Sequence, residues 1–169
     1  MNKVNFLTFF CSLIICSAFG QNAIKIDLAK QITASASHSI KLYKFNSKNK
    51  CNQSKSVSII DGDKVSTCFD YVKTISTSNT KKIASLLRES TTYGNEDVAC
   101  FDTEYGLLIF DKSNVVIGYI NISWSCNKLI SNPIISEREQ YAKQELRKVG
   151  FSKKGRSSLI KLLEILDSH

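Results

Sequence analysis

Two apolar segments bracketed by cysteines constrain the fold of this chain most strongly. Tyr105 to Asp111 and Val115 to Trp124 are rich in β-branched, aromatic and leucine residues, and the polar stretch 112–114 separates them. Such a pair of segments around a short polar connection is typical of a β-hairpin. The chain is therefore predicted to contain an antiparallel hairpin over residues 105–124.

Cysteines stand just outside both ends of this hairpin. Cys100 and Cys126 each lie thirteen residues from Ser113, so a turn centred on Ser113 places them opposite each other. Opposed residues in an antiparallel pair have Cβ atoms about 4.5–5.5 Å apart, close to what a disulfide requires when the pair is not hydrogen-bonded. We predict a Cys100–Cys126 disulfide. Among the four cysteines that follow residue 20, a Cys51–Cys68 disulfide then follows by elimination.

The first twenty residues have the layout of a cleaved secretory signal. Lys3 supplies a positive charge, and Phe6 to Ile15 form an apolar core. Ala18-Phe19-Gly20 then places small residues before a cut at Gln21. The apolar run is shorter than the roughly 20 residues that span a bilayer, and no later stretch is long and apolar enough. We expect residues 1–20 to be removed, no transmembrane segment to remain, and the protein to be secreted or periplasmic.

An exported chain with an even number of cysteines is expected to use them in disulfides. Removal of the signal from the 169-residue chain leaves 149 residues, which are enough for one domain with a substantial core. The composition, 43% hydrophobic and 22% charged, is that of a globular domain. We predict one domain over residues 21–169, with a flexible start at about 21–39 because 33–39 is rich in serine and alanine. Residues 22–32 fit either a helix face or a strand face.

The other segments predict strands first and helices last. We expect strands at 40–45, 57–60 and 65–71, a turn at Asp61-Gly62-Asp63, and a helix capped by Ser78 or Thr80 that runs to about Ser90. A capping box, Ser136-x-x-Glu139, is expected to open a helix that Gly150 closes. The last helix should follow Ser152 and bury Leu159, Leu162, Leu163 and Leu166. This order predicts an α+β fold, a mainly antiparallel sheet with two or three helices on one face, stabilised by disulfides.

Basic residues cluster near the junction of the last two predicted helices. With Lys3 removed, the formal net charge falls from +8 to +7, and no acidic residue lies between Arg147 and Leu163. Such a cluster is a candidate surface for an anionic partner: a lipid headgroup, a polyanionic glycan or an acidic protein. The alternative is a solvated face that keeps the protein soluble. The candidate residues are Arg147, Lys148, Lys153, Lys154 and Arg156.

The sequence contains few of the patterns that carry catalysis or bind cofactors. There is no C-x-x-C pair, no phosphate-binding glycine loop and no G-x-S-x-G or H-E-x-x-H motif, and the two histidines are His38 and His169. Asp61-Gly62-Asp63 resembles the start of a calcium loop but lacks the terminal glutamate, since position 72 is Val72. We therefore expect no metal and no cofactor. No nucleic-acid motif is present either, and we expect no nucleic-acid partner.

Several features along the second half of the chain occur in the same order in a known family. They are Cys100-Phe101, the predicted strands at 107–111 and 117–122, Cys126-Asn127, and Ser152-Lys153-Lys154-Gly155 before the leucine helix. In this order they resemble a family of small exported proteins of unknown function from Gram-negative bacteria. The chain differs from that pattern at Thr103, Tyr105 and Ser123, where the family has proline, histidine and cysteine. The resemblance implies an exported α+β domain and assigns no activity.

These observations favour an exported, non-enzymatic binding or interaction protein of the cell envelope or the extracellular space. Its expected partner is an envelope protein or an anionic surface. One alternative is a small hydrolase that uses Asp102, Glu104 or Tyr105 near the mouth of the hairpin. Another alternative is a periplasmic inhibitor or immunity protein.

Overall fold

The computed structural model describes residues 27–34, 38–49, 57–62, 64–94, 100–145 and 149–168. The predicted signal (1–20), Cys51, and the basic residues Arg147 and Lys148 lie outside these ranges, so what was expected of them stays a prediction. None of the described helices combines the length and the apolar character that crossing a bilayer requires.

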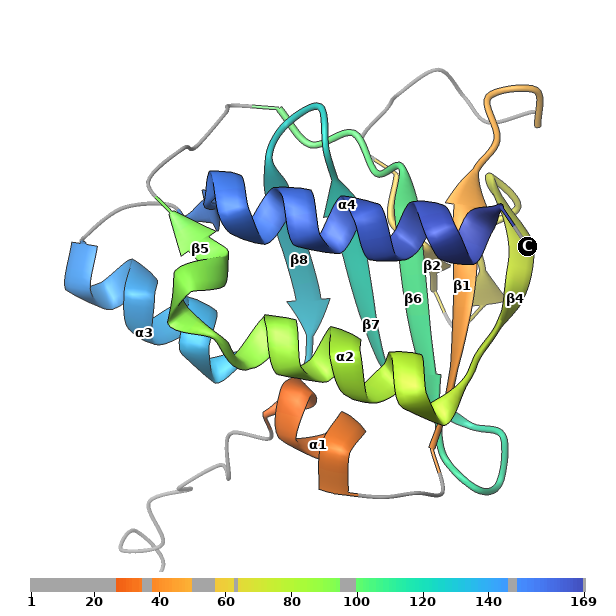
Figure 1. The fold of residues 1–169 in the computed structure, drawn as a ribbon. Coiled ribbons are helices and arrows are strands. Elements are labelled where there is room, and N and C mark those ends of the chain that lie inside the picture. The colour runs from red at the N-terminus through yellow and green to blue at the C-terminus, as the bar shows by residue number, and fades with distance from the viewer. Residues whose placement is uncertain are drawn as a thin grey trace, which may run out of the picture.

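A five-stranded antiparallel sheet forms the centre of the fold (Figure 1). The order across the sheet is β4-β1-β6-β7-β8, so the predicted hairpin β6–β7 lies inside the sheet and β4 and β8 are its edges. Two short ladders complete the strands, β2 with β3 and β5 with β9. The strands are β1 (Ser39–Phe45), β2 (Ile60–Asp61), β3 (Lys64–Val65), β4 (Phe69–Ile75), β5 (Tyr93–Gly94), β6 (Tyr105–Phe110), β7 (Val116–Ser123), β8 (Lys128–Asn132) and β9 (Gly150–Phe151).

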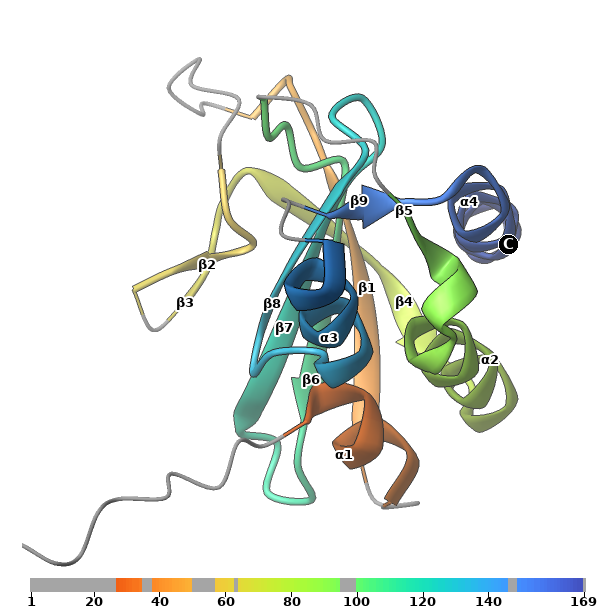
Figure 2. The ribbon, with the colours of Figure 1, turned by 90° about the vertical axis from the view of Figure 1, so that its left-hand side faces the viewer.

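The helices cover one face of this sheet, and the β2–β3 ribbon lies on the other (Figure 2). The described residues contain four α-helices and one short 3-10 helix, where two or three helices were expected. The predicted α+β class, with a mainly antiparallel sheet, is confirmed. The helices are α1 (Leu28–Ala34), α2 (Thr77–Arg88), η2 (Ser90–Thr92), α3 (Ser136–Glu145) and α4 (Lys153–Asp167).

The additional helix, α1, lies where a flexible start was expected. Leu28, Ala29 and Ile32 are buried in the core between the helices and the sheet. Asp27 precedes the helix, and its carboxylate accepts the N–H groups of Ala29 (2.9 Å) and Lys30 (3.3 Å). Because this cap satisfies two of the first N–H groups and the apolar face is buried, the helix alternative is right for residues 28–32; residues 22–26 lie outside the described ranges.

Strand β6 is buried on both faces and separates two apolar layers. All six of its residues are buried. Leu107 and Ile109 belong to the layer beneath the helices, whereas Leu108 and Phe110 pack with Ile59 on the opposite face. This explains why the segment has an almost continuous apolar sequence instead of alternating polar and apolar residues.

Two of the predicted strands, 57–60 and 65–71, are shorter or interrupted in the structure. Only Ile60 of the segment 57–60 is in a strand, because the Ile59 N–H donates to the side-chain oxygen of Asn121 at 2.9 Å instead of to a neighbouring strand. The third strand begins at Phe69, not Val65, since a turn closed by the Phe69 N–H and the Ser66 carbonyl (3.2 Å) interrupts it. In the predicted turn before it, Gly62 has the expected positive φ, 63°, and Asp63 lies outside the described residues.

Three predicted helix ends are wrong. Helix α2 is capped by Ser76, whose hydroxyl accepts the Asn79 N–H at 3.4 Å. Helix α3 already includes Ser136, and the Glu139 N–H donates to the Ile135 carbonyl (3.2 Å), so the proposed capping box does not form. Gly150 lies in strand β9 and pairs with Gly94, so it does not cap α3.

The Cys100–Cys126 disulfide is present, with an S–S distance of 2.09 Å and a Cα–Cα distance of 5.4 Å. The register used to predict it is wrong by one residue. Tyr105 pairs with Ile122, and the ladder shifts between Ile109 and Phe110. Neither cysteine lies in the ladder, because β6 begins at Tyr105 and β7 ends at Ser123.

Hydrogen bonds beyond the ladder hold the two cysteine-bearing segments together. The Ser123 hydroxyl accepts the Asp102 N–H (3.2 Å) and the Cys126 N–H (3.3 Å). The other predicted disulfide has one cysteine in the described residues. Cys68 is disulfide-bonded, but Cys51 lies outside the described residues, so their pairing stays a prediction.

Helix α4 follows the prediction closely. The Ser152 hydroxyl caps it by accepting the Gly155 N–H at 3.0 Å. Three of its leucines are buried, and Leu162 is partly buried beside them. Its first turn approaches η2 so closely that a Cβ on Gly155 would lie 2.2 Å from the Thr92 carbonyl oxygen. Only glycine fits there without displacing one backbone from the other.

Candidate binding site

A surface groove lies between α2 and α4, which run side by side across the helical face of the molecule (Figure 1). Its volume is about 380 Å³. Helix α4 contributes four residues at the spacing i, i+3, i+4, i+7, which places them on one side of that helix; α2 contributes three at the spacing i, i+3, i+4, and its C-cap residue adds a fourth. The lining residues are Lys82, Ser85 and Leu86 from α2, Glu89 at its C-terminal cap, and Ser158, Lys161, Leu162 and Ile165 from α4.

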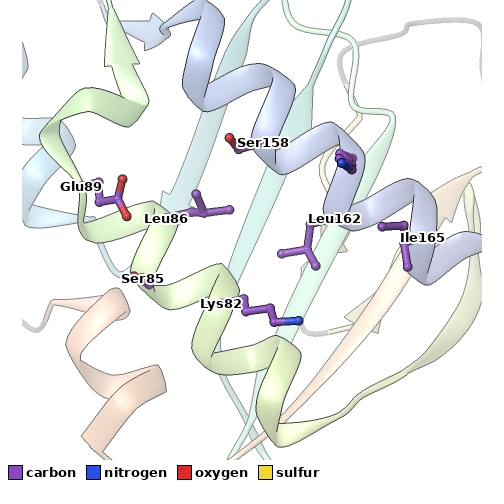
Figure 3. A pocket seen from close by; sticks show the side chains of 8 residues that line it. Lys82, Ser85, Leu86, Glu89, Ser158, Leu162 and Ile165 are labelled. Atoms are coloured by element: carbon purple, nitrogen blue, oxygen red, sulfur yellow. The ribbon is translucent and has the colours of Figure 1, made fainter.

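The middle of the groove is apolar. Leu86 and Leu162 point toward the space between the helices (Figure 3), and both are only partly buried. Ile165, further along α4, is 49% exposed. Three apolar side chains thus line the same surface groove. A helix whose apolar residues all faced the core would have polar residues at these positions. The prediction that Leu162 is buried is therefore wrong: it lines the groove between the two helices and is only partly buried.

Charged side chains border the apolar strip. Lys82 extends from α2 toward α4, while Glu89 lies near the opposite end of the groove (Figure 3). Lys161 adds a second cation from α4. It also lines a neighbouring hollow on α4, whose volume is about 520 Å³ and which includes Lys153 and Arg156. The apolar groove and the basic surface therefore adjoin through Lys161.

The predicted basic cluster is partly described. Lys153, Lys154 and Arg156 are exposed on the first turn of α4, and that turn contains no acidic residue. The Arg156 guanidinium donates to the Trp124 carbonyl at 2.9 Å, which attaches this turn to the end of β7. Lys82 and Lys161 were missed by the sequence interpretation because their proximity depends on how α2 packs beside α4.

The residues proposed for a hydrolase have separate structural partners. The Glu104 carboxylate accepts the N–H groups of Trp124 (2.7 Å) and Ser125 (3.0 Å), so it stabilises the turn after β7. Asp102 uses its backbone N–H to contact Ser123 and Cys126. The Tyr105 hydroxyl donates to another carboxylate, that of Asp167. The side chains of Glu104 and Tyr105 therefore have structural partners, whereas the Asp102 contacts are those of its backbone.

Asp167, at the end of α4, forms an ionic contact with the sheet. Its carboxylate accepts hydrogen bonds from the Lys44 ammonium and, at 3.0 Å, from the Tyr105 hydroxyl. The hydrogen bond from Lys44 is the main reason that the pKa of Asp167 lies below its usual value of 3.8. The same bond raises the pKa of Lys44, while burial is the first cause that raises the pKa of Tyr105.

We expect Asp167→Asn to lower the free energy of unfolding by less than about 1 kcal/mol at neutral pH, since an exposed ion pair is screened by water. Because the folded-state pKa of Asp167 is depressed, its contribution is present above the ordinary value of 3.8 and is lost as pH falls through the folded value. Urea unfolding of both proteins from neutral pH down to about pH 3 should therefore show the difference shrinking in acid.

Glu164→Gln is a suitable control for that measurement, because Glu164 is an exposed acid on the same helix. A difference between wild type and Asp167→Asn that stayed constant with pH would contradict the ionic role of Asp167.

No group of three or more histidine, cysteine or acidic residues that could hold a metal ion occurs within the described ranges. No protein-family model, no curated protein and no solved structure matches this chain. The resemblance to the family of small exported proteins therefore stays a prediction, and the function has to be inferred from the fold and the groove.

Proposed function

We propose that this chain is an exported, non-enzymatic binding protein of the cell envelope or the extracellular space, and that the exposed surface of α4 binds an anionic partner. The observation that carries the proposal is the position of Lys153, Lys154 and Arg156. They occupy the first turn of a helix, where the helix dipole disfavours positive charge, and no acid compensates them there.

Because positive charges in the first turn lower the stability of the helix, we attribute their presence to binding. An anion beside this turn would interact favourably with the three cations and with the positive end of the helix dipole. The neighbouring cations Lys161 and, across the groove, Lys82 extend the same positive surface. The alternative, a solvated face that only promotes solubility, predicts no partner whose binding depends on these charges.

The Cys100–Cys126 disulfide supports the exported location. Disulfides form and persist mainly in oxidising compartments, such as the periplasm and the extracellular space. The secretory signal predicted over residues 1–20 is consistent with the same destination. The contacts of Glu104 and Tyr105 give the hydrolase alternative no further support, whereas an inhibitor or immunity protein would be a special case of the proposed binding function.

The test compares the mature protein with charge-reversed variants in a pulldown from envelope extract. The double variant Lys153→Glu/Lys154→Glu changes the first turn of α4 but leaves the Arg156 contact with Trp124 intact. A matched control, Lys64→Glu/Lys112→Glu, makes the same charge change at exposed positions in β3 and in the β6–β7 turn.

We expect the α4 variant to bind the captured partner about tenfold more weakly, and high salt to weaken binding to the wild type. The control should bind as the wild type does. Equal retention by the wild type and the α4 variant, or no retention of an anionic molecule by either, would contradict the proposed function.

A further inference from the structure

We propose that the groove between α2 and α4 binds an acidic amphipathic helix of a partner protein. This inference rests on the proposed function, since it takes the partner to be anionic, and it adds the chemical class of that partner. Three features of the groove carry it: its apolar strip, its shape and the positions of its cations.

The apolar strip is the first feature. Leu86, Leu162 and Ile165 come from two neighbouring helices and leave apolar surface in water, with Ile165 49% exposed. Covering this surface is favourable by the hydrophobic effect. An amphipathic helix commonly covers such a strip by laying its apolar face into the groove between two helices.

The shape of the groove is the second feature. Its walls are residues 82–88 of α2 with the cap residue Glu89, and residues 158–165 of α4, so each is about two helical turns long. A partner helix with apolar residues at i, i+3, i+4 and i+7 has an apolar face of the same length. A single acyl chain would fill the bottom of this open groove but leave one of its own sides in water. The body of a helix covers both the groove and the ligand's own apolar face.

The positions of the cations are the third feature. Lys82 and Lys161 lie on opposite walls, so acidic residues on both flanks of a bound helix would each meet a cation. Lys153 and Arg156 continue the positive charge beyond Lys161 along α4, in a hollow whose lining has three cations and one acid, Glu164. Glu89 is the one acid in the lining of the groove. This arrangement favours a partner whose flanking residues are acidic, and it disfavours a basic one through like-charge repulsion.

The experiment measures binding of a synthetic peptide to the mature, disulfide-bonded protein by fluorescence anisotropy. The peptide has roughly 18 residues, or five helical turns, with leucines along one face and glutamates on the others. A second peptide has the same composition in scrambled order and therefore no apolar face. A third keeps the leucines but has lysine in place of every glutamate.

The groove variant is Ile165→Gln, which removes an exposed apolar side chain without adding charge. Ile130→Gln is its matched control, because Ile130 on β8 is 45% exposed and does not line the groove. Both variants should fold, since neither residue is in the core. Their circular dichroism spectra and melting temperatures establish this before binding is measured.

We expect the acidic amphipathic peptide to bind the wild type at least about tenfold more tightly than the scrambled and basic peptides. Ile165→Gln should weaken that binding by about tenfold, and Ile130→Gln should leave it unchanged. Equal binding of the amphipathic and scrambled acidic peptides would overturn this inference, while the proposed binding of an anionic partner would still hold.

Two other results would also overturn the inference. One is binding to vesicles that contain anionic lipid but to neither acidic peptide, which would identify a membrane surface as the partner. The other is peptide binding that Ile165→Gln and Ile130→Gln affect equally, which would place the site elsewhere. Failure of the proposed function is recognised separately: in the envelope pulldown, the wild type and Lys153→Glu/Lys154→Glu would then retain the same partner equally well.

Discussion

Leu163→Ala should lower the free energy of unfolding by about 2–5 kcal/mol, the range found for core leucines. Leu163 is 0% exposed and packs in the layer between the helices and the sheet. Alanine would remove apolar contacts from a site enclosed by two layers of structure and leave a cavity. In a domain whose total stability is about 5–15 kcal/mol, such a loss is a large fraction.

Urea unfolding followed by circular dichroism measures this loss. Leu162→Ala is the matched control, because Leu162 is on the same helix but is only partly buried beside the groove. We expect the control to lose clearly less stability. If Leu163→Ala melted as the wild type does, or if the two variants lost the same stability, the assignment of Leu163 to the core would be wrong.

Removal of the Cys100–Cys126 disulfide should cost about 2–5 kcal/mol, the usual range for a small secreted domain. The bond joins residues 26 positions apart and closes a loop that contains the whole β6–β7 hairpin, so its loss allows the unfolded chain many more conformations. The double variant Cys100→Ala/Cys126→Ala isolates this effect. A reductant would act on the Cys68 disulfide as well.

Two measurements check that expectation. Non-reducing peptide mapping of the wild type should find Cys100 and Cys126 in one linked fragment, and denaturant unfolding should give the stability of the double variant. A fragment that joins Cys100 to Cys51 or Cys68 would contradict the observed pairing. Unchanged stability of the double variant would show that the hydrogen bonds of Ser123 and Glu104 suffice to hold the two segments together.

The sequence predicts those parts of the fold that depend on short-range interactions. The β6–β7 hairpin, the turn at Gly62 and the leucine helix α4 with its Ser152 cap are all recognisable from neighbouring residues. The class of the fold follows from their order along the chain. The disulfide was also predicted correctly, although the register behind that prediction was not.

The sequence did not predict features in which a distant part of the chain decides the local structure. Ile59 has the apolar neighbours of a strand residue, but the side chain of Asn121, 62 positions away, takes its N–H. Gly150 follows a helical segment as a cap would, but it is paired in a strand with Gly94. Local patterns contain no information about such partners, so tertiary contacts override them.

The candidate site divides in the same way. The exposed cations Lys153, Lys154 and Arg156 are close together in sequence and were recognised from the sequence alone. The groove was not recognised, because strands β5 to β9 separate its two walls along the chain. Only the packing of α2 beside α4 brings Leu86 near Leu162. A leucine at the border of a core-facing stripe is indistinguishable by spacing from one inside it.

The contact between Gly155 and η2 sets the width of one end of the groove, although Gly155 does not line the groove. η2 follows directly after α2, and α4 rests against it through the backbone at Gly155. The separation of the two walls at that end is therefore set by the absence of a side chain outside the groove. A family of related proteins with alanine or serine at this position would have to hold α4 further from α2, and would present a wider groove to a different partner.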